Sequence, residues 1–331
     1  MPKAAVIHEK GGPEVFRYED VEVGDPGAGE VRLKHIAIGV NYADTYHRGG
    51  VSHPWPVGEP PVIVGFEATA EVMEIGAGVE GFAVGDRVVY GLPPLGAYSQ
   101  ERIYPVSTLL AIPRGIDALA LAGIFMKGLT AYYLLHKTYA VKPGDWVLVH
   151  AAAGGMGNVL VPWAKYLGAH VIGTVGSEAK AAVARELGCD HVIDYSSEDF
   201  AARCRALTGG TGVHVVYESI GKATLTKSLD SLRPLGMCAA YGHASGPPDP
   251  VDIIQDLGAR GSLFVTRPAV MHYLATRGAL EEAAAALFDA LAAGIIRSTV
   301  NHTYPLSEAA NAHRAIHERR TTGSSVLLPF A

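Results

Sequence analysis

The sequence is poor in the features that mark membrane-spanning, nucleic-acid-binding and disulfide-linked proteins. No uninterrupted apolar run approaches the roughly 20 residues needed to span a bilayer. Lysine and arginine form no long cluster, and the net charge of −6 disfavours a nucleic-acid partner. The cysteines lie far apart without a C-x-x-C pair, as is typical of reduced cytosolic thiols: Cys189, Cys204 and Cys238. The N-terminal residues indicate a strand and not a signal peptide, so we expect a cytoplasmic protein with neither a membrane nor a nucleic-acid partner.

The length and the order of the sequence patterns indicate two domains, one inserted into the other. The chain has 331 residues, of which 49% are hydrophobic, enough for two cores of ordinary size. Short β-like runs broken by glycine and proline dominate residues 1–110, which is typical of a compact β-rich barrel. From residue 115 or so, helical and apolar strand patterns alternate, and after residue 270 or so the chain returns to helices and a final strand at 325–328. The alternation predicts a parallel sheet with helices on both faces.

The alternating region predicts a particular order of elements. Strands are expected at 146–150, 170–175, 191–194, 213–217, 236–241 and 262–266. Helices are expected at 117–137, 158–167, 178–187, 198–207 and 222–232. Parallel strands in this order bring their carboxyl ends to one edge, where open α/β sheets bind ligands. We expect a substrate cleft where this domain meets the β-rich one.

A turn of small residues joins the first of these strands to its helix. Its sequence, Ala151-Ala152-Ala153-Gly154-Gly155-Met156-Gly157, fits the G-x-G-x-x-G pattern with alanine in place of the first glycine. Glycines there let the chain turn sharply and let backbone N–H groups approach a pyrophosphate at a helix N-terminus. The pattern alone is weak, but the flanking strand, helix and second strand supply its usual context. We therefore expect a bound dinucleotide.

The second strand of this unit lacks the acidic residue that hydrogen-bonds the ribose 2′-hydroxyl of NAD. Its tip reads Gly173-Thr174-Val175-Gly176-Ser177, and Lys180 and Tyr195 follow. A hydroxyl, an ammonium and a phenol would suit a 2′-phosphate, although a solvated helix face is the alternative for a lone lysine. Glu178 is the opposing observation, but an acid at a helix start commonly serves the helix dipole. These residues favour NADPH over NADH.

Several further motifs are spread over essentially the whole chain. They are Gly11-Gly12-Pro13-Glu14-Val15, Gly39-Val40-Asn41-Tyr42-Ala43-Asp44, Gly85-Asp86-Arg87-Val88, Lys127-Gly128-Leu129-Thr130, Tyr217-Glu218-Ser219-Ile220-Gly221, Val265-Thr266-Arg267-Pro268 and Thr322-Gly323-Ser324-Ser325. Together with the turn at 151–157 they resemble the medium-chain dehydrogenase/reductase superfamily, and above all its zinc-free, zeta-crystallin-like quinone oxidoreductases. The resemblance implies a doubly wound Rossmann domain at 127–268, inserted in a GroES-like β-rich barrel catalytic domain formed by 1–126 and 269–331. It also implies a homodimer joined through the last strand of the Rossmann sheet.

The positions that bind catalytic zinc in zinc-dependent relatives carry other residues here. Those relatives have a cysteine where this chain has Asn41, and Gly-His-Glu where it has Gly65-Phe66-Glu67. No cysteine precedes Cys189, so the four-cysteine structural lobe has no counterpart. Tetrahedral zinc takes thiolate, imidazole or carboxylate ligands, which asparagine and phenylalanine do not provide. We expect no zinc.

Without such a Lewis acid, the hydride acceptor must delocalise its own negative charge. A quinone does so, because hydride addition gives an aromatic hydroquinone anion that takes a proton from water. The prediction is an NADPH:quinone oxidoreductase, acting by zinc-independent hydride transfer on a quinone or a related small electrophile. Two alternatives stay open: an NADPH-dependent reductase of activated C=C bonds in enals or enones, with Tyr46 as proton donor, and a non-catalytic nucleotide-binding protein of the lens-crystallin kind.

The resemblance assigns individual residues to the substrate and the cofactor. Asn41 and Tyr46 are expected at the substrate, with Asn41 donating to a quinone oxygen, although Asn41 could satisfy a turn and Tyr46 could simply pack. The adenosine phosphate is assigned to Ser177, Lys180 and Tyr195, with Arg320 as a fourth partner or a plain surface charge, and Gly176 is a further cofactor-binding residue. The other cofactor contacts, from the pyrophosphate to the nicotinamide, are assigned to Asn41, Thr130, Gly154, Gly155, Met156, Ser219, Tyr241, Gly242, His243, Ala244, Phe264, Val265 and Thr266.

The histidines are assigned no acid–base or metal chemistry. His243 is not expected to act as a base, because quinone reduction needs none. The fourteen histidines show no metal-ligand spacing. His47 and His53 are expected to be exposed in a loop rich in glycine and proline.

Overall fold

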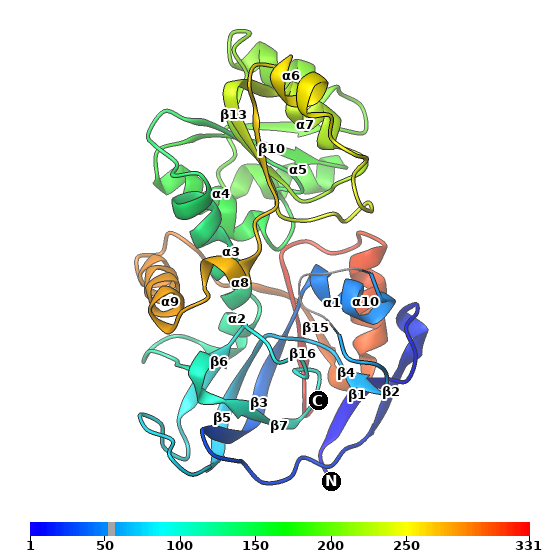
Figure 1. Ribbon diagram of the computed structural model, residues 1–331, viewed down its shortest axis with the longest axis vertical. Helices are drawn as coiled ribbons and strands as arrows, with labels where there is room; N and C mark the ends of the chain where they lie inside the picture. The colour runs from blue at the N-terminus through cyan, green and yellow to red at the C-terminus, as the bar shows by residue number, and fades with distance from the viewer. Residues whose placement is uncertain (52–56) are drawn as a thin grey trace. The chain divides into compact units, whose positions relative to one another are not determined.

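The structure, a computed structural model, describes residues 1–51 and 57–331 (Figure 1). The chain forms two compact units. Unit 1 comprises Met1–Lys127, Thr276–Ala284 and Ser298–Ala331, and unit 2 comprises Gly128–Ala275 and Ala285–Arg297. The predicted domain boundaries differ from these units in the C-terminal segment, where residues 269–275 and 285–297 group with unit 2.

Unit 1 is built on two β-sheets. A three-stranded sheet has the order β2–β1–β4, and a seven-stranded sheet has the order β15–β16–β3–β5–β6–β8, with β7 also paired to β3. The strands are β1 (Lys3–Ile7), β2 (Phe16–Asp20), β3 (Glu30–Val40), β4 (Val62–Ile63), β5 (Ala68–Ile75), β6 (Arg87–Tyr90), β7 (Glu101–Pro105), β8 (Leu110–Ala111), β15 (Val300–Pro305) and β16 (Ser324–Leu328). Strand β3 shows why they form: Val31, Leu33 and His35 alternate with charged residues and are buried on one face.

Short helices complete unit 1. They are α1 (Tyr42–Gly49), α2 (Ala118–Ala122) and α10 (Ala309–His317), with the 3₁₀ turns η1 (Pro13–Val15), η2 (Val106–Thr108) and η5 (Leu306–Glu308). The helices α3 (Phe125–Tyr133) and α9 (Arg277–Ala292) each contribute residues to both units. None of the helices in the described part of the chain is long and apolar enough to cross a membrane.

Unit 2 contains a parallel sheet with the order β11–β10–β9–β12–β13–β14. Its strands are β9 (Trp146–Val149), β10 (His170–Val175), β11 (His191–Asp194), β12 (Val213–Glu218), β13 (Leu232–Ala240) and β14 (Phe264–Thr266). Its further helices are η3 (Leu134–Thr138), α4 (Gly157–Tyr166), α5 (Glu178–Glu186), α6 (Phe200–Leu207), α7 (Leu225–Asp230), η4 (Ile253–Gly258) and α8 (Val270–Tyr273). Counted from β9, the order is 3-2-1-4-5-6, which is that of a dinucleotide-binding Rossmann sheet.

The predicted fold class is confirmed, and the deviations lie at element ends. The helix expected at 117–137 is divided into α2, α3 and η3, since α2 ends at Ala122 with Gly123 as its C-cap. The helix expected at 222–232 is limited to α7, since Gly221 has φ +87°, outside the helical region. The strand expected at 236–241 begins earlier, at Leu232.

The expectation that His47 is exposed in a loop is wrong. His47 lies in α1 and is fully buried. The helix begins directly after β3 because the Asp44 carboxylate accepts the backbone N–H of Asn41 at 2.8 Å, which satisfies a donor at the helix N-terminus. His53 lies outside the described residues.

His35, on β3, is a neutral histidine in the core of unit 1. Its Nδ1–H donates to the carbonyl of Ser99 at 2.6 Å, so its Nε2 accepts the Tyr90 hydroxyl at 2.8 Å. Burial lowers the pKa of His35 from 6.5 to about 3. The unfolded chain therefore takes up this proton at a pH where the folded chain does not.

This difference predicts a loss of stability in acid. The contribution of His35 is fully present above pH 6.5 and is lost as the pH falls toward 3. In His35→Gln, the slope of unfolding free energy against pH between pH 6 and 4 should decrease by up to about 1.4 kcal/mol per pH unit. Denaturant titrations at a series of pH values measure it. The two proteins should give parallel curves above pH 7, and equal slopes in acid would contradict the assignment.

Candidate functional site

The strand order of unit 2 reverses between β9 and β12, and a buried histidine–glutamate pair lies at the carboxyl ends of these two strands. His150 directly follows β9, and Glu218 is the last residue of β12. Their side chains approach to 3.3 Å between Nε2 and Oε2, and both are almost completely buried. Ligands of open α/β sheets bind outside the strand ends at such a reversal. The pair therefore lies at the edge of the sheet where the dinucleotide is predicted.

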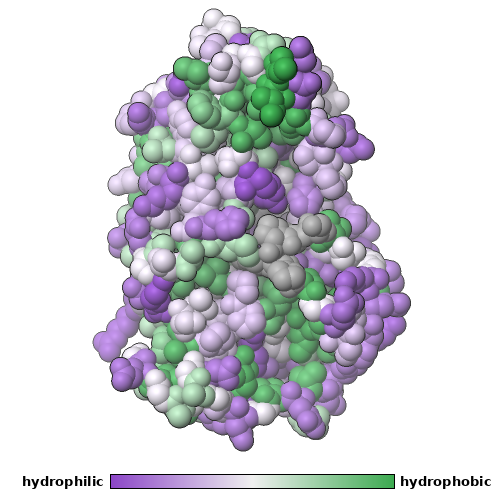
Figure 2. All heavy atoms as spheres, viewed as in Figure 1, coloured by the Kyte–Doolittle hydropathy of each residue, from purple (hydrophilic) through white to green (hydrophobic). Residues whose placement is uncertain are grey.

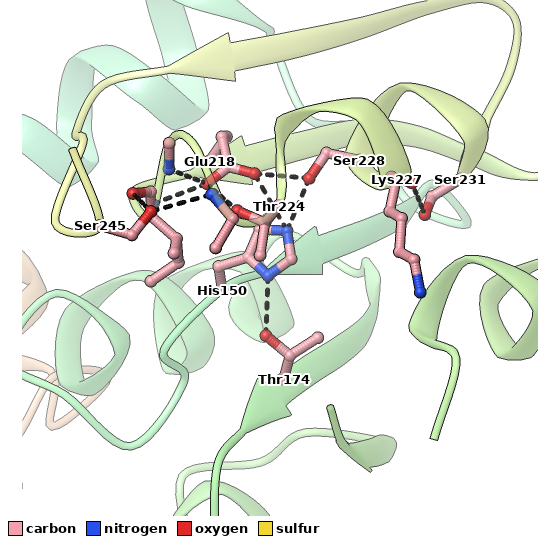
Figure 3. Close-up of polar contacts among 11 residues, drawn as sticks. His150, Thr174, Glu218, Thr224, Lys227, Ser228, Ser231 and Ser245 are labelled. Carbon is pink, nitrogen blue, oxygen red and sulfur yellow. Dashed lines mark hydrogen bonds and ion pairs between the residues drawn. The ribbon is translucent and has the colours of Figure 1, made fainter. Parts of the chain in front are cut away.

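A directed set of hydrogen bonds surrounds this pair (Figure 3). The Ser228 hydroxyl donates to Glu218 Oε2 at 2.5 Å, so its oxygen accepts from His150 Nε2 at 2.9 Å. His150 Nδ1 is then left to accept the Thr174 hydroxyl at 2.8 Å. Burial lowers the pKa of His150, while Glu218 acts in the opposite direction. The network links β9, β10, β12 and α7.

The other carboxylate oxygen of Glu218 holds the loop that follows β12. Glu218 Oε1 accepts the backbone N–H of Ile220 at 2.6 Å and of Gly221 at 3.1 Å, and the Thr224 hydroxyl at 3.0 Å. This loop in turn binds the loop after β13, because Ala244 donates to the Ser219 carbonyl at 3.1 Å and Ser245 to the Ile220 carbonyl at 2.7 Å. Glu218 thus anchors the two loops that carry the predicted contacts Ser219 and 241–244.

The glycine-rich turn packs tightly against the start of α4. A Cβ on Gly157 would lie 2.0 Å from the Ala152 carbonyl oxygen and 2.8 Å from its Cα, which backbone atoms cannot accommodate. Gly154, Gly155 and Met156 lie directly before the first turn of α4. A helix N-terminus reached by a turn of small residues fits a pyrophosphate, whose charge the helix dipole favours. These residues suit a dinucleotide.

Three of the residues predicted for an adenosine phosphate, Gly176, Ser177 and Tyr195, lie together at the end of β10. Ser177 caps α5, with its hydroxyl accepting the backbone N–H of Lys180 at 3.4 Å. A Cβ on Gly176 would lie 2.7 Å from the Tyr195 hydroxyl, so this phenol lies against the same turn. Glu178 pairs with Arg185 at 2.7 Å, further along α5. A second carboxylate, that of Asp194, lies at the end of β11 beside this turn and accepts from Ser196.

The residues predicted near a nicotinamide have distinct surroundings. The Thr130 side chain hydrogen-bonds the Tyr133 phenol, whose pKa burial raises. His243 is partly buried, and its pKa is lowered by burial and by the charge of Arg267. Phe264, in contrast, is 55% exposed on β14, the edge strand of the sheet.

In unit 1, the carboxamide of Asn41 lies in a buried cluster with Glu67 and Lys127. Asn41 Nδ2 donates to Glu67 Oε2 at 2.6 Å, and Lys127 Nζ donates to Asn41 Oδ1 at 2.9 Å. Lys127 also donates to the Gly123 carbonyl at 2.8 Å, and Glu67 Oε1 accepts the backbone N–H of Met126 at 2.6 Å. Burial raises the pKa of Glu67, although Lys127 and Asn41 act in the opposite direction. We call these three residues the Asn41 cluster.

A second buried chain of hydrogen bonds fixes the backbone of Asn41. Arg48 can only donate, so His313 accepts from it at Nδ1, at 2.9 Å, and donates through Nε2 to the Tyr98 hydroxyl at 2.8 Å. Tyr98 then donates to Asp44 Oδ2 at 3.0 Å, the oxygen that also accepts the Asn41 N–H. Burial raises the pKa of Asp44 to about 7, against the effect of these hydrogen bonds. Side chain and backbone of Asn41 are thus fixed independently.

The residues of the Asn41 cluster do not fit a zinc ion. Both polar atoms of the Asn41 side chain are engaged, and Phe66 offers no ligand atom. The Lys127 ammonium, 3.9 Å from Glu67 Oε2, is already the cation that accompanies this carboxylate, so a metal ion would be repelled. Among the described residues, no group of three or more His, Cys, Asp and Glu side chains could hold a metal.

Tyr46 and Arg320, which are predicted to contact a ligand, lie in unit 1 outside the Asn41 cluster. Tyr46 is almost buried in α1, with its ring 5.4 Å from that of Tyr42 in an edge-to-face arrangement. Arg320 donates to Glu318 at 2.6 Å and is well exposed. Their contacts with a substrate and with an adenosine phosphate stay predictions.

Sequence reasoning missed Glu67, Lys127, His150 and Glu218 as members of these networks. All four lie in or beside motifs that carry the family resemblance, which was the available signal. Their pairing depends on strand order and on contacts between distant residues, and a motif does not contain that information.

The β-rich unit and the Rossmann unit together define the medium-chain dehydrogenase/reductase class. Residues 27–138 match the alcohol dehydrogenase GroES-like domain, and residues 155–289 match the zinc-binding dehydrogenase domain. The chain is 60% identical to a 2-haloacrylate reductase of a Burkholderia species over 100% of both chains. It is 45% identical to a quinone oxidoreductase of Pseudomonas aeruginosa, over 99% of this chain and 100% of that one.

A solved structure shows the same architecture. The crystal structure of Escherichia coli quinone oxidoreductase complexed with NADPH matches with a TM-score of 0.95 and 41% identity, over 99% of this chain and 100% of that one. The chain therefore belongs to the medium-chain dehydrogenase/reductase superfamily, in the group that contains these quinone oxidoreductases and the haloacrylate reductase.

The Glu218 network predicts a graded response to substitution. Glu218→Ala should lower the unfolding free energy by about 3–5 kcal/mol, because buried donors of the 219–224 loop and of Ser228 lose their acceptor. Glu218→Gln should cost less, since its carbonyl oxygen can keep the donors that bind Oε1. Chemical denaturation measures both.

Ser231→Ala is the matched control. Its hydroxyl donates to the Lys227 carbonyl at 2.8 Å (Figure 3) and also hydrogen-bonds the Cys204 thiol, and both partners lie outside the Glu218 network. It should cost about 1 kcal/mol or less. A Glu218→Ala variant no less stable than this control would refute the anchoring role.

Proposed function

We propose that this protein is an NADPH:quinone oxidoreductase that transfers hydride to its acceptor without zinc. The observation that carries the proposal is the Asn41 cluster, in which an amide fixed beside an ammonium occupies the place of a metal-binding donor set. The full-length similarity to quinone oxidoreductases supports the same activity.

The residues around Asn41 limit the kind of hydride acceptor. An alcohol or a simple carbonyl compound develops a localised alkoxide charge, which a metal ion usually stabilises. A quinone spreads the charge over an aromatic ring, so hydrogen bonds from residues such as Asn41 suffice. NADPH, when bound, supplies the hydride with its electron pair. The quinone accepts it, and a proton from water completes the hydroquinone.

The cofactor proposal rests on two regions of unit 2. The turn at Gly154, Gly155 and Met156 would hold the pyrophosphate at the start of α4. Ser177, Lys180 and Tyr195 would hold the 2′-phosphate beside Gly176, with Arg320 as a further partner. The E. coli relative was solved with NADPH, as its name states, which supports this choice.

The remaining predicted contacts would orient the nicotinamide end. We assign them to Thr130, Ser219, the loop 241–244, Val265 and Thr266, with Asn41 and Tyr46 at the substrate. The lowered pKa of His243 agrees with a residue that shapes the pocket and does not donate a proton.

A second candidate function is the reduction of an activated C=C bond. The specific observation that favours it is the 60% identity to a 2-haloacrylate reductase over the full length. A haloacrylate and a quinone share a conjugated system that ends in oxygen, so the same Asn41 cluster could serve either acceptor. A purely structural, crystallin-like role has no such support.

We also propose a homodimer joined at β14, in the cytoplasm. This strand is the edge of the Rossmann sheet, and an unpaired edge can extend the sheet into a second copy. Large apolar side chains are exposed nearby in sequence: Phe264 by 55%, Ile253 by 76% and Ile254 by 73%. Figure 2 shows hydrophobic atoms gathered on the surface of unit 2. The three free, buried cysteines agree with a reducing compartment.

Steady-state kinetics with NADPH distinguish these functions. The acceptors are 1,4-benzoquinone, 9,10-phenanthrenequinone, 2-chloroacrylate and an alkyl enone. We expect kcat/KM for a quinone to match or exceed that for either C=C acceptor. The reverse order would support the second candidate, and tight NADPH binding without any turnover would exclude both activities.

The cofactor proposal predicts that Lys180→Ala weakens NADPH binding by about 10- to 100-fold, the loss of a charge-assisted hydrogen bond. NADH binding should change little, because NADH lacks the 2′-phosphate. Dissociation constants from fluorescence titration test it. Lys142→Ala, an exposed lysine that precedes the amino end of β9, is the control and should leave both affinities unchanged. Equal losses for the two cofactors in Lys180→Ala would reject the phosphate assignment.

A further inference from the structure

We infer that Lys127 and Glu67 are positioning residues that fix the Asn41 carboxamide in one orientation, with a polarised N–H reserved for the oxygen of the hydride acceptor. This inference rests on the proposed reductase function and names two residues that act through Asn41. The argument uses the donors and acceptors of the cluster, their burial and the charge of the ammonium.

The orientation of the Asn41 amide is determined by its two neighbours. An ammonium can only donate, so Lys127 Nζ, at 2.9 Å, requires the carbonyl oxygen of Asn41 on its side. Glu67 Oε2, at 2.6 Å, requires the amide nitrogen. Turning the amide over would place a donor against the ammonium and an acceptor against the carboxylate. Since Lys127 and Glu67 are 7% and 0% exposed, water cannot readily replace these contacts.

Glu67 and Lys127 are in turn held by the backbone. The Met126 N–H and the Gly123 carbonyl bind Glu67 Oε1 and Lys127 Nζ, respectively, at 2.6 and 2.8 Å. The orientation of Asn41 is therefore set by the segment that joins α2 to α3, independently of any substrate. Such preorganisation avoids the cost of ordering a donor at the moment of reaction.

The hydrogen-bond inventory of Asn41 shows what remains for a ligand. Its Oδ1 accepts from Lys127, and one of the two hydrogens on Nδ2 goes to Glu67. The second hydrogen on Nδ2 has no partner among the described residues. The Asn41 side chain can therefore offer a ligand one N–H donor from Nδ2.

The ammonium also strengthens this donor. A hydrogen bond from a cation to the amide oxygen draws electron density from the nitrogen, and bonds linked in this way reinforce one another in a buried site. Negative charge that develops on an acceptor oxygen after hydride arrival is thereby stabilised. Asn41 transfers no proton in this scheme: the hydride comes from NADPH, and the proton comes from water.

The arrangement defines a substrate class. The carbon that receives hydride must be conjugated to an oxygen that can accept the Asn41 N–H. Quinones, enones and acrylates meet this condition, and the chain is similar to reductases named for two of these classes. An isolated alkene or an alcohol–carbonyl pair that needs a metal ion does not.

A double-mutant cycle tests the inference, with the acceptor that the wild-type protein reduces fastest. Asn41→Ala and Lys127→Met should each lower kcat by about 10- to 100-fold. Lys127→Met should leave the dissociation constant for NADPH nearly unchanged, because Lys127 is not an assigned cofactor contact. In the Asn41→Ala background, Lys127→Met should have no further effect beyond about twofold, because the lysine acts through the missing amide. Lys127→Arg, which keeps the charge and a donor, should restore part of the activity.

Lys3→Met is the matched control, since Lys3 is an ion-paired lysine of unit 1 that binds Asp20 at 3.1 Å. It should retain wild-type kcat. If Lys127→Met does not fold, the same double-mutant cycle is measured with Glu67→Gln or with Lys127→Arg, each combined with Asn41→Ala. Equal fold-losses from a cluster substitution in both backgrounds would overturn the positioning role alone. Absence of turnover with every acceptor would overturn the proposed function and this inference together.

Discussion

A fully buried carboxylate must be matched by hydrogen-bond donors, and this constraint shapes both units around their predicted sites. Glu67 and Glu218 have no exposed surface. Glu218 gathers backbone N–H groups of the loop after β12, and Glu67 gathers a backbone N–H, the Asn41 amide and the charge of Lys127. Neither carboxylate is itself a predicted ligand contact. Each one fixes the position of groups that are predicted to contact a ligand.

In the function proposed above, the Asn41 cluster would keep a positive charge near the hydride acceptor without a zinc ion. A metal ion binds the reacting oxygen directly and carries two charges. The Lys127 ammonium carries one charge and, in the function proposed above, would act on the acceptor through the neutral Asn41 amide to which it donates. This weaker electrostatic stabilisation suits acceptors that delocalise their own negative charge, and it requires no metal ion. In this proposal, the range of acceptors that the protein can reduce follows from the residues that stabilise charge on the acceptor oxygen.

The alternation of apolar strands and helices was sufficient to predict the Rossmann sheet, since each element carries its own local pattern. The Asn41 cluster could not be predicted in this way, because residues 41, 67 and 127 meet only through the pairing of distant segments. His47 was placed wrongly for a related reason. The glycines and prolines that follow it suggested a loop, whereas the Asp44 cap and burial in unit 1 produce a helix. Ser177 and Tyr195, by contrast, could be assigned to one place from strand order alone.

The ion pair between Glu178 and Arg185 has a consequence for cofactor choice. The carboxylate is held away from the turn that would receive a 2′-phosphate by an exposed partner two helical turns along α5. Exposed pairs of this kind are weak and are screened by salt. At the phosphate site proposed above, the charge of Glu178 would therefore be less well neutralised at high salt, and the preference for NADPH over NADH would depend on ionic strength.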